Sequence, residues 1–93
     1  MTTRAVRLRI TGRVQGVGYR AWAITTASRL QLRGWVRNRI DGSVEALVIG
    51  DDDGVTAMIV ACRDGPFAAR VGEVAVSEAD DDGSTGFSPR PTV

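Results

Sequence analysis

Residues 12–20 read G-R-V-Q-G-V-G-Y-R, and this glycine loop separates a strand pattern from a helix pattern. Before the loop, the apolar residues of 6–10 alternate with arginines, which predicts a strand over 4–13 that has one face in solvent. After it, the spacing predicts a helix over 20–32 that Gly34 ends. A glycine loop at a helix start directs backbone N–H groups and the positive end of the helix dipole toward one point. We therefore expect an anion site at this loop.

Further along the chain, two strands and a helix are predicted. Residues 35–40 form one strand, residues 41–42 (Asp-Gly) are a two-residue hairpin turn, and residues 43–49 return as the next strand. An i, i+3, i+4, i+7 apolar stripe over residues 55–62 then predicts a second helix, which three preceding acids suit. Gly65-Pro66 ends this helix.

The last part of the chain carries weaker patterns. Val71, Val74 and Val76 indicate a fourth strand, and Phe87 is expected to hold a short fifth strand at the edge of the sheet. Prolines within residues 86–93 limit the pairing of that fifth strand. We therefore expect residues 1–93 to form a single domain, because 93 residues suffice for one core but not for two.

The order βαββαβ predicts an α+β fold, a ferredoxin-like two-layer sandwich with an antiparallel sheet and both helices on one face. The crossover through the first helix makes strands one and two parallel, and strand three fits between them. The carboxyl ends of strands one and two then lie at the same edge of the sheet. Because the glycine loop follows strand one and Asn38 lies near the end of strand two, we expect Arg20 and Asn38 to lie close together.

Charge and cysteine content narrow the class of protein. Residues 1–45 hold nine arginines and two acids, whereas residues 46–93 hold three arginines and nine acids, so the first half suits an anionic partner. The chain has no histidine, and its one cysteine, Cys62, forms neither an internal disulfide nor a zinc site. No apolar run approaches the roughly twenty residues that span a bilayer, so we expect a cytoplasmic protein without membrane contact.

The glycine loop can be compared with two nucleotide-binding motifs. A P-loop requires a lysine, and the chain has none. Residues 16–21 fit the dinucleotide pattern G-x-G-x-x-[GA], with Asp41 about twenty residues further on. Against it, the first strand alternates with arginines instead of being wholly apolar, Asp41 belongs to a tight turn, and the chain is short for that fold. The remaining interpretation is a site for a small phosphorylated substrate. The guanidinium of Arg20 offers the phosphate oxygens a planar pair of hydrogen-bond donors.

Two separated stretches carry a resemblance to the acylphosphatase family. Residues 12–20 resemble the first motif of that family, with Tyr19 where phenylalanine is common. Residues 34–50, which read G-W-V-R-N-R-I-D-G-S-V-E-A-L-V-I-G, resemble the second. The resemblance covers residues 6 to about 76, whereas the proline-containing end of the chain departs from the family pattern.

The resemblance implies hydrolysis of the carboxyl–phosphate bond of a small acyl phosphate. We expect a monomer, because no pattern indicates an obligate interface, and a reaction without metal or cofactor, because the chain has no histidine and no metal-binding cluster. The resemblance gives Arg20 the role of phosphate-binding arginine and Asn38 that of water-positioning residue. The backbone amides that complete the phosphate site are those of Gln15, Gly16, Val17, Gly18, Tyr19 and Arg20. The alternative is a non-catalytic module on the same fold that binds phosphate or nucleic acid. RNA-binding modules stack bases on aromatics of the central strands, and strands 6–10 and 44–49 carry none.

Overall fold

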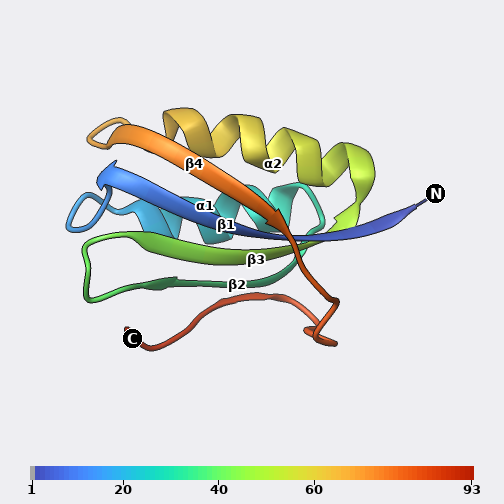
Figure 1. The fold of residues 1–93 in the computed structure, drawn as a ribbon. Coiled ribbons are helices and arrows are strands. Elements are labelled where there is room, and N and C mark those ends of the chain that lie inside the picture. The colour runs from blue at the N-terminus through green and yellow to red at the C-terminus, as the bar shows by residue number, and fades with distance from the viewer. Residues whose placement is uncertain (1) are drawn as a thin grey trace.

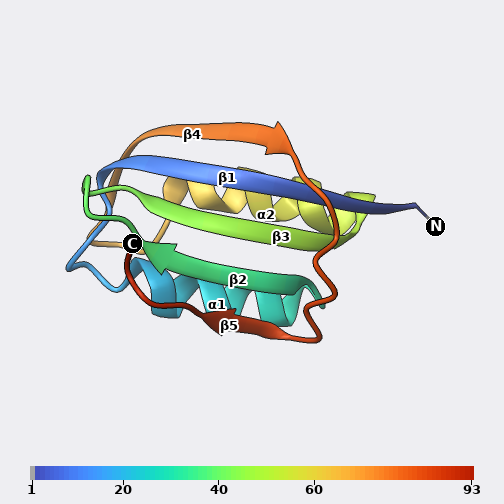
Figure 2. The same ribbon diagram turned by 60° about the horizontal axis from the view of Figure 1, so that its bottom comes forward.

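Five strands and two helices make up the computed structural model, which describes residues 2–93 (Figure 1). In chain order they are β1 (Thr3–Arg13), α1 (Tyr19–Arg29), β2 (Arg33–Asn38), β3 (Val44–Asp51), α2 (Asp52–Asp64), β4 (Arg70–Glu78) and β5 (Phe87–Pro89). The strands form one sheet in the order β4-β1-β3-β2-β5, and both helices cover the same face of it (Figure 2). The predicted element order and two-layer sandwich are confirmed, with β3 between β1 and β2.

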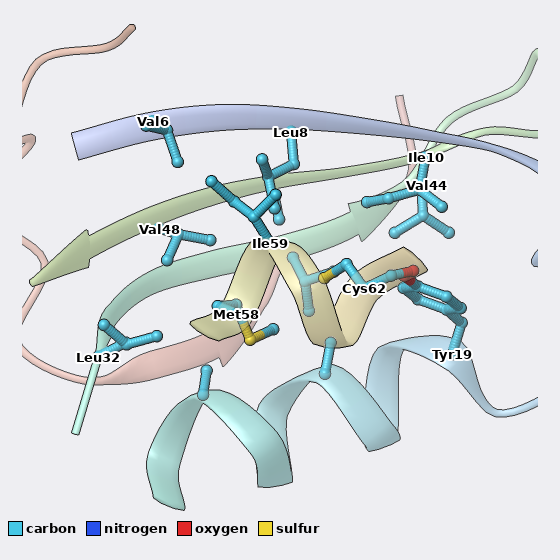
Figure 3. Close-up of a cluster of buried hydrophobic side chains, with 14 of the residues drawn as sticks. Val6, Leu8, Ile10, Tyr19, Leu32, Val44, Val48, Met58, Ile59 and Cys62 are labelled. Carbon is cyan, nitrogen blue, oxygen red and sulfur yellow. The ribbon is translucent and has the colours of Figure 1, made fainter. Parts of the chain in front are cut away.

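The core lies between the sheet and the helices, and the alternation of apolar residues puts it there. Three consecutive inward positions of β1 pair with inward positions of β3, namely Val6 with Val48, Leu8 with Ala46 and Ile10 with Val44. The apolar stripe of α2 closes this layer with Val55, Met58, Ile59 and Cys62 (Figure 3). The strand period of two and the helix period of 3.6 therefore meet in one buried layer.

The edge of the sheet differs from the expectation of a wholly antiparallel sheet. The fifth strand exists, but β5 pairs with β2 in parallel, so the sheet is mixed. After β4 the chain crosses the end of the sheet and returns alongside β2 (Figure 2). The Arg90 N–H donates to the Val36 carbonyl oxygen at 2.9 Å, so bonding alternates along this edge and the nitrogen of Pro89 lies on its unpaired side. A proline is tolerated there because it removes no hydrogen bond.

The end of α1 is the second difference. The helix stops at Arg29, and the backbone turns at Gln31, whose φ is 60°. The Leu32 N–H donates back to the Ala27 carbonyl oxygen at 2.9 Å, which is the helix-ending hydrogen bond of a Schellman motif. A non-glycine residue here occupies the left-handed conformation that we expected of Gly34. The strand β2 consequently begins at Arg33, two residues earlier than predicted.

Gly34 serves instead to let two strands approach. It lies within β2 opposite Val48, and its φ is 132°. A Cβ atom at this position would lie 1.8 Å from the Leu47 carbonyl oxygen of β3. Since the backbone fixes the Cβ position and the carbonyl oxygen belongs to the backbone of β3, no side-chain rotation can relieve that contact. The glycine is required by the packing of β2 on β3 and not by the end of α1.

Candidate active site

The glycine loop leaves a set of backbone donors without partners. Among residues 2–93, no protein acceptor takes the N–H groups of residues 15–21. The first hydrogen bond of α1 runs from the Trp22 N–H to the Gly18 carbonyl oxygen at 3.0 Å, and no side chain caps the helix start. No acid lies in the first turn of α1 either. Unpaired N–H groups at the positive end of a helix form a site for an anion.

Two glycines shape this part of the loop. Gly16 and Gly18 have φ values of 73° and 82°, in the left-handed region that other residues adopt at a cost. A Cβ atom at either position would meet nothing within 4 Å. These glycines are therefore required by the backbone conformation, and the space beside them is open. Backbone turns of this kind direct successive N–H groups into an anion-binding concavity.

Arg20 and Asn38 line the same cleft, as the topology predicts. The cleft has a volume of about 330 Å³ and lies between the glycine loop, α1, the end of β2 and β5. Its lining comprises Val14, Gln15, Gly16, Gly18, Tyr19, Arg20, Ala21, Ile24, Asn38 and Pro89. Figure 1 shows the β1–α1 loop, the β2–β3 turn and the C-terminus at one end of the sheet. Of the residues predicted for the site, Val17 does not line the cleft, and its side chain packs against the core.

The two side chains differ in exposure and in partners. Arg20 is exposed in the first turn of α1 and forms no ion pair with any described residue. Asn38 is the last residue of β2, and its Oδ1 atom is buried without a hydrogen-bond partner among residues 2–93. A buried polar atom without a donor costs free energy, so such an atom in a cleft indicates a ligand or a bound water. The cleft thus offers N–H donors and a guanidinium together with one acceptor.

Sequence reasoning missed four of the lining residues. Ala21 and Ile24 follow Arg20 on α1, and Ile24 is one helical turn away at i+4, a spacing that could have indicated it. Val14 precedes the donors in the glycine loop. Pro89 lies near the C-terminus and reaches the cleft because β5 pairs with β2. The sequence did not predict that pairing.

Tyr19 contributes its backbone to the site and its side chain to the fold. The ring is buried, and the hydroxyl donates to the Cys62 carbonyl oxygen of α2 at 2.6 Å (Figure 3). That carbonyl lacks the usual helical donor because the residue four positions later is Pro66, which has no N–H. Burial, together with the Cys62 contact, raises the pKa of Tyr19 above its usual value. The hydroxyl therefore anchors the start of α1 to the end of α2.

Replacing Tyr19 with phenylalanine is expected to lower the free energy of unfolding by about 1–3 kcal/mol. The substitution keeps the ring but leaves the buried Cys62 carbonyl oxygen without a donor, and that range is typical of a buried polar group that loses its partner. Urea denaturation measures the change. Since the hydroxyl is bonded to α2 and the substitution keeps the ring and the backbone N–H of residue 19, the activity of the folded variant should stay within about twofold of the parent protein. Unchanged stability would contradict the anchoring role.

Asp41 is committed to the hairpin turn, and this removes the dinucleotide reading. Its carboxylate accepts hydrogen bonds from the Ser43 hydroxyl at 2.6 Å, the Ser43 N–H at 2.9 Å and the Arg9 guanidinium at 2.6 Å. The Ser43 hydrogen bonds, with that from Arg9, hold the pKa of Asp41 well below its usual value. The carboxylate has no role left as a ribose ligand.

The sheet face opposite the helices bears on the nucleic-acid alternative. Its aromatic side chain is Trp35, which is only 4% exposed. The guanidinium carbons of Arg37, Arg90 and Arg7 lie 4.7, 5.2 and 5.9 Å from the centre of the indole ring. A ring that guanidinium groups already cover gives nucleic-acid bases no stacking surface.

Comparison with known proteins decides the family. The sequence model of the family described as Acylphosphatase matches residues 6–89. The chain belongs to the acylphosphatase family. An acylphosphatase of Rhodospirillum rubrum is 48% identical over 97% of this chain and 99% of its own length. An acylphosphatase of Rhodopseudomonas palustris is 56% identical, over 88% of this chain and 83% of its own.

Solved structures of acylphosphatases share the fold. The crystal structure of the Bacillus subtilis acylphosphatase has a TM-score of 0.91 and 33% sequence identity, and the match covers 96% of this chain and 99% of that one. The resemblance drawn from the two sequence motifs and the ferredoxin-like fold are both confirmed. Because the family match extends to residue 89, it includes β5, which the sequence motifs did not reach.

Two further properties concern metal binding and membrane spanning. Within residues 2–93, no three His, Cys, Asp or Glu side chains gather in a way that could hold a metal ion. In the same residues, neither helix is long and apolar enough to cross a membrane.

Proposed function

We propose that the chain hydrolyses acyl phosphates in the 330 Å³ cleft, with Arg20 and the N–H groups of the glycine loop holding the phosphoryl group and Asn38 holding the attacking water. The activity itself follows from membership in the acylphosphatase family, so the chain is an enzyme, and a non-catalytic phosphate- or nucleic-acid-binding module is not favoured. The observation that carries the residue roles is the meeting, in one cleft, of unpaired donors with the buried and unpaired Oδ1 of Asn38.

Phosphate binding uses the donors of the site. The N–H groups of residues 15–20 and the α1 dipole attract the phosphoryl oxygens, and the Arg20 fork donates two further hydrogen bonds. As the bond to the acyl oxygen breaks, charge shifts within the phosphoryl group and onto the leaving carboxylate. Fixed donors stabilise that charge without reorganising, which is the main demand of phosphoryl transfer.

Water activation uses the acceptor. The Oδ1 atom of Asn38 accepts a hydrogen bond from water and thereby directs an oxygen lone pair toward phosphorus. The water oxygen forms a new bond to phosphorus while the bond between phosphorus and the acyl oxygen breaks. The carboxylate leaves as an anion, and the protons of the water pass to the phosphate product and to solvent. A carboxylate is a stable leaving group, so the step does not require the histidine that the chain lacks.

The assay that tests this function is hydrolysis of benzoyl phosphate by the purified chain. We expect turnover, and we expect the rate to be unchanged by EDTA, because the chain itself supplies the positive charge through Arg20 and the loop amides. Folded protein without turnover would contradict the activity. Loss of the rate on chelation would contradict the proposed residue roles.

Replacing Asn38 with alanine is expected to lower kcat about 10²-fold while KM changes by less than about threefold. The amide acts on the water and not on the bound phosphoryl group, so substrate binding should survive its removal. Steady-state kinetics with benzoyl phosphate separate the two constants, and inhibition by inorganic phosphate reports the integrity of the phosphate site. A rise in KM that accounts for the whole loss would assign Asn38 to phosphate binding instead.

The same proposal extends to the state of the enzyme. We propose a single-domain monomer acting on a small acyl phosphate, because the glycine loop, Arg20 and Asn38 already form the cleft without a second copy. Cys62 is a free, buried thiol whose pKa burial raises to about 11. We propose a cytoplasmic location, where unpaired cysteines are usual. Analytical ultracentrifugation at assay concentrations tests the monomer, and a sedimentation coefficient of a dimer would contradict it.

A further inference from the structure

The side chain of Gln15 joins the glycine loop to the β2–β3 turn. Its Nε2 atom donates to the Arg39 carbonyl oxygen at 2.7 Å and to the Ser43 carbonyl oxygen at 2.9 Å. Arg39 and Ser43 are the two ends of the turn, and the Arg39 N–H itself donates to the Ser43 carbonyl oxygen at 2.8 Å. A primary amide has two N–H bonds, so both are used, one on each side of the turn.

These hydrogen bonds connect the two halves of the site. Gln15 contributes a backbone N–H to the phosphate donors, and Arg39 is the residue next to Asn38. In the described chain, no other hydrogen bond runs between residues 14–18 and residues 38–43. The pairing of β1 and β2 with β3 sets the approximate positions of the loop and of Asn38. The Gln15 side chain then links the loop directly to the turn beside Asn38.

We propose that Gln15 is a positioning residue, which fixes the distance between the phosphate donors of the glycine loop and the water held by Asn38. This role rests on the proposed function of the cleft. Displacing a reacting group by about 1 Å can lower a rate ~10²-fold, so a tether between the donor and acceptor sides acts on kcat. It leaves phosphate affinity unchanged, because the loop retains its own N–H groups and Arg20.

The chemistry of the tether requires a donor of this length. Gln15→Met keeps the volume of the side chain and removes both hydrogen bonds. Gln15→Asn keeps the amide, but it is one methylene shorter and cannot reach both carbonyl oxygens. Gln15→Glu would place carboxylate oxygens against the carbonyl oxygens of Arg39 and Ser43 and should be the most harmful of the three.

The test is a double-mutant cycle between Gln15 and Asn38, measured with benzoyl phosphate. In the parent background, Gln15→Met is expected to lower kcat about tenfold, with KM and the inhibition constant of inorganic phosphate within about twofold. In the Asn38→Ala background, the same substitution should lower kcat by less than about twofold, because no held water remains to be misplaced. Gln15→Asn should recover part of the tenfold loss.

A matched control separates positioning from general loosening of β2. Arg33→Met removes a comparable tether at the other end of the strand, where the guanidinium bonds to Asp81 and to the Ser84 carbonyl oxygen. This control should change the thermal midpoint but not kcat. Equal effects of Gln15→Met in both backgrounds would overturn the positioning role, and so would a rise in the phosphate inhibition constant that matches the kcat loss.

The remaining outcomes are also decisive. If Gln15→Met does not fold, as judged by circular dichroism, Gln15→Asn takes its place in the cycle, and failure of both to fold makes Gln15 a structural residue and overturns the proposal. An Asn38→Ala variant with the kcat of the parent protein overturns the proposed function and this role with it. Asn38→Ala with reduced kcat and an additive cycle overturns only the role of Gln15.

Discussion

Replacing Arg20 with alanine should lower kcat/KM at least about 10³-fold, which corresponds to about 4 kcal/mol of transition-state stabilisation. Arg20 is the charged side chain of the cleft, and the N–H groups around it carry only partial charges. The loss should appear in both constants, since the guanidinium binds the phosphoryl oxygens in the substrate and more strongly as charge develops. Steady-state kinetics with benzoyl phosphate measure the effect.

Two further variants make this result specific. Arg20→Lys keeps the charge but not the planar fork, so it should recover only part of the lost rate. Arg29→Ala is the matched control, because Arg29 is also an exposed arginine of α1 without an ion pair in the described chain, but it lies in the last turn. It should retain full activity. Complete recovery by lysine would show that net charge alone serves the site, and equal loss in both alanine variants would contradict a local role for Arg20.

Replacing Gly34 with alanine should lower the free energy of unfolding by at least about 3 kcal/mol, or prevent folding. The new Cβ atom would lie 1.8 Å from the Leu47 carbonyl oxygen, so β2 and β3 would have to separate. The residue would also hold a φ of 132°, which alanine rarely adopts. For a chain of this size, a loss of about 3 kcal/mol lowers the thermal midpoint by more than about 12 °C.

Gly42→Ala separates the cost of the steric contact from the cost of the strained backbone angle. Gly42 lies in the β2–β3 turn with a φ of 94°, but a Cβ atom there would meet nothing within 4 Å. Its replacement therefore carries backbone strain alone and should cost about 1–2 kcal/mol. Thermal and urea denaturation of both variants give the comparison. A Gly34 variant no less stable than the Gly42 variant would contradict the close approach of the two strands.

The sequence predicted those features that depend on local pattern and on topology. Alternation in β1 and the stripe of α2 gave the core, and the parallel relation of β1 and β2 brought Arg20 and Asn38 to one cleft. The end of α1 could not be predicted from local pattern. The hydrogen bonds that end the helix hold Gln31 in the left-handed conformation, for which glutamine has no intrinsic preference. Gly34 suggested a helix end, but glycine is required there because the backbone of β3 lies too close for a Cβ atom.

Long-range contacts set the limit for the site. Gln15 was predicted as a backbone donor, whereas its side chain bonds to residues 24 and 28 positions away, which no local pattern encodes. The parallel pairing of β5 was missed for a similar reason, since three residues carry too little pattern to reveal the direction of a strand. Pro89 lines the cleft only because that strand lies beside β2.

The unpaired Oδ1 atom of Asn38 has a consequence for how this fold can be improved. Burying an amide at the end of β2 is less favourable than burying an apolar side chain of similar shape, so Asn38→Leu would raise the stability of the domain while abolishing its reaction. Stability screens that ignore activity would select that change. The end of β2 is therefore a place where the most stable sequence and the working sequence differ, and thermostable designs based on this chain should hold residue 38 fixed.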